Sequence, residues 1–171
     1  LDIDTARSLH AGEQVLLNGI VYTARDAAHK RLHNLIKQHR PLPVDLQNQT
    51  IYYTGPSPAK PGHIIGSAGP TTSSRMDRYA PLLIEMCGLR AMIGKGNRSK
   101  KVIEAMKKHG CVYFAATGGA GALLSKAIKK ADVVCYEDLG PEAVHRLEVK
   151  DLPVVVAIDC EGNSLYKVVR D

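Results

Sequence analysis

The sequence contains little of what a self-contained metal centre or a membrane segment needs. Its four cysteines, Cys87, Cys111, Cys135 and Cys160, lie more than twenty residues apart and form no C-x-x-C pair. This spacing argues against a zinc or iron–sulfur site made by this chain alone, and we expect buried, reduced thiols. No apolar run approaches the roughly 18 residues of a membrane span. The first residues, Leu1-Asp2-Ile3-Asp4, are too acidic for a signal peptide, so we expect a cytoplasmic protein.

The charge balance and the glycine-rich turns give only weak signals for nucleic acid or nucleotide. The net charge of +6 comes from 23 basic and 17 acidic residues, too modest and dispersed to establish nucleic-acid binding. The P-loop pattern does not occur, because Lys95 precedes Gly96. Gly118-Gly-Ala-Gly121 resembles a dinucleotide turn, but Leu124 replaces its last glycine. A non-catalytic nucleotide- or anion-binding module using Gly118 to Gly121, and a nucleic-acid binder, are the two alternative hypotheses.

Strand and helix patterns alternate along the chain and predict one α/β domain over residues 1–171 with a mixed sheet. Residues 14–22 predict two short strands or one bulged strand, because Asn18-Gly19 interrupts an apolar stretch. Further strands are predicted at 50–54, 63–66, 89–93, 111–117 and in a closing hairpin of 154–158 and 164–169. Helices are predicted to begin near residues 24, 75 and 99, with a restart at Pro81, and to run from the glycine-rich turn through about Ala131.

Three cations follow predicted strands, where open α/β sheets place ligands. Arg25 and Arg75 fall in the first turn of predicted helices, where a cation opposes the helix dipole at a cost of roughly 0.3–1 kcal/mol. Lys95 lies between Gly94 and Gly96, which let the backbone approach a ligand closely. These positions favour an anion site, and solvent-exposed side chains are the alternative interpretation.

Two capping-box patterns predict where the helices beside these cations begin. They are Thr23-x-x-Asp26 and Ser74-x-x-Asp77, and the second places Thr71 and Thr72 at or just before a helix N-terminus. Free backbone N–H groups would there face a carboxylate or a phosphate.

Three stretches together resemble one protein family. They are Tyr22-Thr-Ala-Arg-Asp-Ala-Ala-His29, Gly69-Pro-Thr-Thr-Ser-Ser-Arg-Met-Asp77 and Gly94-Lys-Gly-Asn-Arg-Ser99. The chain resembles the iron–sulfur hydro-lyases of the class I fumarate hydratase and tartrate dehydratase type. More narrowly, it is similar to their beta subunit, which is equivalent to the C-terminal domain of the single-chain enzymes. Thr117-Gly-Gly-Ala and Tyr136-Glu-Asp-Leu-Gly140 fit the same pattern.

The resemblance implies a fold, a reaction and a partner. The implied fold is a swivelling three-layer β/β/α domain. The implied reaction is reversible addition of water to a C4 dicarboxylate, with fumarate to malate as the first choice and tartrate dehydration as the second. The implied partner is an alpha subunit that carries a [4Fe–4S] cluster, so that the enzyme is a hetero-oligomer in which this chain alone binds no cofactor.

The resemblance also implies roles for individual residues. Arg25, Arg75 and Lys95 would bind the substrate carboxylates. Thr71 would abstract the C3 proton together with a carboxylate from the partner, while the cluster acts as a Lewis acid on the hydroxyl. Ser73-Ser74, where relatives often carry smaller residues, leaves the exact substrate open. The supporting loop residues are Gly69, Thr72, Gly94, Gly96, Asn97 and Arg98.

Overall fold

The computed structural model describes residues 1–116 and 124–166, and its strands join in one mixed sheet. The order is β1-β2-β3-β4-β6-β5, with β1, β2, β3 and β4 parallel and β6 antiparallel to β1, β4 and β5. Because β6 pairs with both β1 and β4, the strands β1, β2, β3, β4 and β6 form a closed ring of paired strands, which we call the closed circuit. β5 pairs only with β6 and lies outside this ring. The strands are β1 (Gln14–Thr23), β2 (Thr50–Tyr52), β3 (Ala91–Gly94), β4 (Val112–Ala116), β5 (Ile128–Cys135) and β6 (Val144–Ile158). The predicted mixed-sheet α/β class is confirmed.

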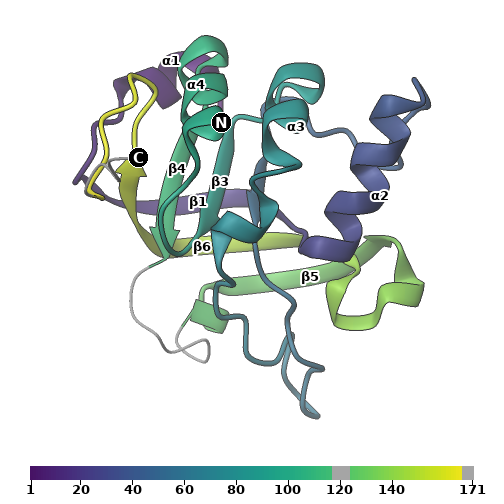
Figure 1. The fold of residues 1–171 in the computed structure, drawn as a ribbon. Coiled ribbons are helices and arrows are strands. Elements are labelled where there is room, and N and C mark those ends of the chain that lie inside the picture. Colours follow the sequence, from purple (N-terminus) through teal and green to yellow (C-terminus); the bar gives the residue numbers. More distant parts are fainter. Residues whose placement is uncertain (117–123, 167–171) are drawn as a thin grey trace.

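The helices α2, α3 and α4 gather on one side of this sheet (Figure 1). Figure 1 shows α2, α3 and α4 side by side, with β1 and β6 running beneath them. The helical elements are α1 (Ile3–Ser8), α2 (Asp26–Lys37), α3 (Ala80–Cys87), α4 (Lys100–His109) and the 3-10 helices η1 (Ser73–Met76) and η2 (Glu137–Glu142). Within residues 1–116 and 124–166, no helix is long and apolar enough to cross a membrane.

The strands β2 and β3 and the first part of β4 are buried on both faces, which explains their nearly continuous apolar runs. One core lies between these strands and the helices, and it contains Ile51, Tyr53, Met92, Tyr113, Leu32, Leu83 and Met106. The other core lies on the opposite face, inside the closed circuit, and it contains Tyr52, Ile93, Phe114, Leu147, Val154 and Val156. Alternate residues of each strand therefore serve different cores, as the two-residue period of a strand requires.

Several predicted boundaries are confirmed. β1 is one strand whose pairing with β6 shifts between Leu17 and Gly19, as the bulged-strand interpretation expects. The Ser99 side chain accepts a hydrogen bond from Val102 N at 3.4 Å and caps α4, which ends at Gly110 with φ of 73°. Pro81 lies in the first turn of α3, where its missing N–H costs nothing.

Both predicted capping boxes are wrong. Thr23 Oγ1 lies within hydrogen-bond distance of His145 Nδ1 at 3.2 Å, and the α2 cap residue, Arg25, makes no side-chain cap bond. The Asp77 carboxylate binds Arg98 and the N–H of Ser99. Partners from other elements outcompete the local bonds that the two patterns predict.

Three predicted elements differ from the structure. Residues 63–66 form no strand, because they belong to an exposed loop that turns at Gly62 (φ of 79°) and pairs with no neighbouring strand. The predicted helix through Ala131 is wrong, since β5 begins at Ile128 and pairs along β6. The closing hairpin is reduced to one antiparallel bridge between Ile158 and Ser164. Its residues 167–169 lie outside the described residues.

The glycine-rich turn also lies outside the described residues. Thr117 and Gly118 to Gly121 belong to the segment 117–123, so the nucleotide-site alternative stays untested.

Candidate active site

Two of the three predicted cations lie just after the carboxyl ends of parallel strands, on either side of β2. Arg25 comes two positions after the end of β1, and Lys95 directly follows β3. Between them, β2 ends at Tyr52 and leads into Thr54. Neighbouring strands lie about 4.8 Å apart, and this end of an α/β sheet is where ligands bind. The sheet order therefore brings segments distant in the sequence to one edge, which we call the cation edge (Arg25, Thr71, Arg75 and Lys95).

Arg75 joins this edge through a bidentate ion pair with Asp26, the first residue of α2. Arg75 Nε donates to Asp26 Oδ1 at 3.0 Å, and Arg75 Nη2 donates to Asp26 Oδ2 at 2.8 Å. Arg25 Nε lies 3.9 Å from Asp26 Oδ2 and 3.9 Å from Glu142 Oε1. The side chains of Arg25 and Arg75 are 27% and 49% exposed, so both can still reach a ligand.

Thr71 and Lys95 are placed by backbone hydrogen bonds. Thr71 N donates to the carbonyl of Tyr53 at 2.7 Å, which attaches this segment to the end of β2. Thr72 forms a parallel bridge with Lys95, and Ser73 N donates to the Lys95 carbonyl at 2.9 Å. Thr71 is half-buried, its hydroxyl bonds to none of the residues in 1–116 and 124–166, and Lys95 is exposed. Backbone hydrogen bonds thus hold both residues in place, and neither side chain bonds to a described residue.

Beneath these loops lies a buried arginine with several partners, which we call the Arg98 cluster (Ser73, Asp77, Tyr53, Tyr113 and Arg98). The Arg98 side chain has no exposed surface, and its Nε donates to Asp77 Oδ1 at 2.7 Å. Its Cζ lies 5.1 Å from the Tyr53 ring centre and 4.8 Å from that of Tyr113. Burial opposes the charge, but Tyr53 and Asp77 more than offset this effect and raise the Arg98 pKa.

The Arg98 cluster ties together the two loops that carry Thr71 and Lys95. Ser73 Oγ and the Tyr113 hydroxyl are hydrogen bonded at 2.7 Å, and the Tyr113 hydroxyl also donates to the Gly96 carbonyl at 2.7 Å. The segment before α3 and the segment after β3 are therefore anchored to the same buried tyrosine.

Close packing, backbone conformation and hydrogen bonds explain which residue types occupy the supporting loop positions. A Cβ on Gly94 would overlap Ser73 Oγ and lie 2.9 Å from a Tyr53 ring carbon, so only glycine fits there. Gly96 has φ of 86°, a left-handed conformation that favours glycine. The Gly69 carbonyl accepts from Thr54 Oγ1 at 2.8 Å. Asn97 Oδ1 accepts a hydrogen bond from the following backbone N–H at 2.8 Å.

The structure brings the predicted residues together but changes the anion-site geometry. Thr72 is the N-cap of the four-residue 3-10 helix η1 and Thr71 precedes it, so the predicted helix N-terminus is confirmed, but the helix that begins there is short and of the 3-10 type. Sequence reasoning also missed Asp26 and Asp77 as partners of the arginines. One sequence signal is available. Asp26 follows Arg25 and Asp77 lies two positions after Arg75, and each of these arginines opposes a helix dipole, so a nearby carboxylate is a reasonable ion-pair partner. The roles of the cation-edge residues stay predictions.

A buried histidine lies directly behind Arg25. His29 Nδ1 lies 2.8 Å from the Arg25 carbonyl, which can only accept, so Nδ1 carries the proton in the neutral ring. His29 Nε2 is buried and has no hydrogen-bond partner among the described residues. The ring packs against Tyr53 and Tyr79, at 5.4 and 6.0 Å between ring centres. Burial lowers the His29 pKa to about 4, although the Arg25 carbonyl partly opposes this shift.

We expect this histidine to make the protein less stable in mild acid. An unfolded histidine binds a proton near its ordinary pKa of 6.5, whereas folded His29 resists protonation down to about 4. Stability from His29 is therefore fully present above pH 6.5 and is lost as the pH falls toward 4, by roughly 3 kcal/mol in total. Urea unfolding across this range should show a steeper pH dependence for the natural chain than for His29→Phe. His63→Gln, at an exposed histidine, is the control, and a His29→Phe slope equal to the natural one would contradict the expectation.

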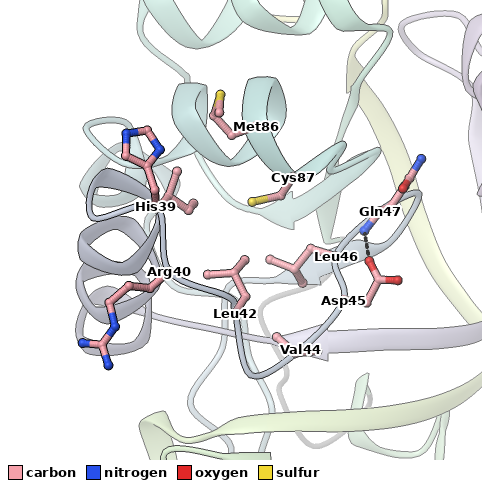
Figure 2. A pocket seen from close by; sticks show the side chains of 10 residues that line it. His39, Arg40, Leu42, Val44, Asp45, Leu46, Gln47, Met86 and Cys87 are labelled. Atoms are coloured by element: carbon pink, nitrogen blue, oxygen red, sulfur yellow. Dashed lines mark hydrogen bonds between the residues drawn. The ribbon is translucent and has the colours of Figure 1, made fainter.

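One hollow lies away from the cation edge. It measures about 550 Å³ and lies among the end of α2, the connection 39–47 and α3. Figure 2 shows Leu42, Leu46 and Cys87 pointing into the space between these elements. Its lining contains none of the four residues of the cation edge, so this hollow is a separate feature.

A smaller hollow lies next to η2, whose residues Gly140 and Pro141 line it. It measures about 340 Å³ and runs between the loop 56–65 and β5, reaching Pro141. A Cβ on Gly55 would lie 3.3 Å from the Pro141 carbonyl and 3.0 Å from Arg25 Cδ. The Pro-rich loop and η2 therefore pack closely around Arg25.

The cysteines of this chain do not fit an iron–sulfur cluster. Cys111 and Cys160 are buried, and Cys87 and Cys135 are half-buried, all as free thiols. Burial raises the pKa of all four, that of Cys111 to about 12, which disfavours the thiolate that binds iron. Among the described residues, no three His, Cys, Asp or Glu side chains are grouped to hold a metal ion.

A family model described as Fumarase C-terminus matches residues 3–169. The chain belongs to this family. The family resemblance inferred from the three sequence stretches is therefore confirmed. The relatives include "Fumarate hydratase 2" of Leishmania major, 41% identical over 156 residues, and "Fumarate hydratase class I, anaerobic" of Escherichia coli, 40% identical over 152 residues. The chain is also 40% identical over 169 residues to "Putative L(+)-tartrate dehydratase subunit beta" of Methanocaldococcus jannaschii.

These relatives of the fumarase C-terminus family differ in length. The matches cover 91% and 88% of this chain but only 28% of each of the two fumarate hydratases. The match to the archaeal protein covers 96% of this chain and 87% of that relative. The same unit thus occurs as part of a longer chain and as a chain of similar length.

Proposed function

We propose that this chain is the beta component of an iron–sulfur hydro-lyase that reversibly adds water to a C4 dicarboxylate. Fumarate hydration to malate is the preferred reaction, and tartrate dehydration is the second. The observation that carries the proposal is the cation edge, where Arg25, Arg75 and Lys95 accompany a Thr71 hydroxyl that bonds to no described residue, near the ends of parallel strands. The names of the family relatives supply the class of reaction.

The three cations suit a substrate with two carboxylates. A guanidinium can bind a carboxylate through two parallel N–H bonds, and an ammonium supplies a compact positive charge. Asp26 and Glu142 offset part of the charge of the arginines, but Lys95 makes no ion pair with a described residue. The cation edge therefore keeps positive charge available for a dianion.

Thr71 is the group proposed to move the carbon-bound proton. Dehydration removes a proton from one carbon and a hydroxide from its neighbour, and hydration reverses both. A hydroxyl is a weak base by itself, so Thr71 either acts with positive neighbours that favour its alkoxide or relays the proton onward. A side chain that bonds to no described residue is free to meet the substrate.

The remaining parts of the site are proposed to come from a partner. Because the cysteines of this chain do not fit a cluster, we propose that an alpha subunit carries the [4Fe–4S] cluster. The low coverage of the longer relatives and the "subunit beta" name of the archaeal relative support a second component. The proposal includes one β-type domain over residues 1–171, a swivelling three-layer arrangement and a cytoplasmic location.

The test is to purify this chain with its native partner and assay hydration and dehydration across a panel of C4 dicarboxylates. We expect the complex to convert at least one of fumarate, malate or tartrate, and the isolated chain to convert none. The partner alone is the matched control, and we expect it to be inactive as well. A complex that converts no dicarboxylate, or an isolated chain that is fully active, would contradict the proposal.

A further inference from the structure

Asp26 occupies one edge of the Arg75 guanidinium and leaves the other edge open. A guanidinium offers two bidentate edges to a carboxylate, one made by Nε with one terminal nitrogen and one made by both terminal nitrogens. Asp26 takes the first through Nε at 3.0 Å and Nη2 at 2.8 Å. No described residue bonds to Arg75 Nη1. The terminal edge of Arg75 is therefore available to a second carboxylate.

The two partners in this ion pair differ in how firmly they are held. Asp26 begins α2, a helix of 12 residues whose buried side chains pack into the core between helices and sheet. Arg75 stands on η1, a 3-10 helix of four residues, and its side chain is 49% exposed. The fixed carboxylate therefore restricts the direction of a long side chain that would otherwise sample many rotamers.

A simpler role for Asp26 is to stabilise the start of α2. An acidic residue in the first turn of a helix interacts favourably with the helix dipole. That role needs only a negative charge, and it does not require both carboxylate oxygens to contact an arginine from another element. The bidentate geometry, and the 3.9 Å approach of Arg25 Nε to the same carboxylate, point to a second role.

We propose that Asp26 is a positioning residue for substrate binding, which orients Arg75 so that its terminal edge faces the substrate carboxylate. This inference rests on the proposed function. Because Arg75 would hold the carboxylate in the ground state and the transition state alike, losing its orientation weakens both equally. The consequence is a higher KM with kcat little changed. The charge of Asp26 also repels the substrate, so the geometric gain must exceed this repulsion.

The test compares Asp26→Asn and Asp26→Glu in the purified complex. Asn offers one acceptor oxygen and turns an N–H toward Arg75, so KM for the dicarboxylate should rise about tenfold or more while kcat stays within about threefold. The inhibition constant of succinate, which has two carboxylates and no double bond to hydrate, should rise in parallel. Glu keeps the charge at the helix start with a longer arm, so it should restore the KM only in part.

The matched control is Asp138→Asn. Asp138 lies on η2 and forms a similar bidentate pair with Arg31, which lies on α2 as Asp26 does. This control substitution should leave KM and the succinate constant unchanged. An Asp26→Asn complex with unchanged or lower KM would overturn the inference while leaving the proposed function standing, and so would full recovery by Asp26→Glu. A natural complex without hydro-lyase activity would overturn the proposed function and this inference with it.

Discussion

Replacing Thr71 by valine is expected to lower kcat of the complex by on the order of 10²–10⁴ while KM changes little. Valine keeps the shape of the side chain and removes only the hydroxyl. The Thr71 backbone N–H still donates to Tyr53, so the loop keeps its place. Carboxylate binding rests on the three cations, so ground-state affinity persists, whereas the proton-transferring group is lost.

Thr72→Val is the matched control for this substitution. Thr72 is exposed, and its contact with Lys95 is a backbone bridge that valine preserves. We expect kcat to fall much less than in Thr71→Val. Steady-state kinetics on both complexes checks the prediction, and a larger loss in Thr72→Val would assign the proton transfer to Thr72 instead.

Replacing Asp77 by alanine is expected to destabilise the fold by about 3–5 kcal/mol, because it leaves a buried charge unpaired. The Arg98 side chain is fully buried, and Asp77 is 12% exposed. The substitution removes an ionic hydrogen bond of 2.7 Å to Arg98 and the 2.7 Å bond that the N–H of Ser99 donates. The two tyrosine rings against Arg98 cannot replace the lost negative charge.

Urea denaturation of the isolated chain measures this effect. Asp138→Ala is the control, because it breaks an arginine pair whose side chains are 40% and 63% exposed, and we expect little change. Adding Arg98→Met to Asp77→Ala should recover part of the loss, since it removes the stranded charge. A loss in Asp77→Ala no greater than in Asp138→Ala would show that the Arg98 cluster contributes little to stability.

The fold was most predictable where local signals and tertiary packing agree. Gly110 ends α4 because its left-handed conformation suits glycine, and Ser99 begins it through its own side chain. Both signals lie within a few residues of the helix ends they define. Prediction failed where pairing partners are remote: β5 is a strand because β6 pairs along it, and its own lysine-rich sequence does not reveal that partner.

The site was predictable to a similar extent and for the same reason. Arg25, Arg75 and Lys95 are predicted to form an anion site because each follows a strand pattern or opposes a helix dipole, which are local properties. The local pattern around Asp26 and Asp77 fits a capping box and predicts that they cap helices. Their actual partners, Arg75 and Arg98, lie 49 and 21 positions away in the sequence. Only the fold decides which of two chemically reasonable bonds a carboxylate makes.

The central claim, that this chain supplies the proton-transferring half of a hydro-lyase, is tested most directly by isotope exchange at the substrate. The measurement follows exchange of the C3 proton of malate, or of the substrate that the panel identifies, with deuterated solvent. The natural complex should exchange this proton, and the Thr71→Val complex should exchange it at a rate lower by on the order of 10²–10⁴. Exchange by the Thr71→Val complex at the natural rate would contradict the account.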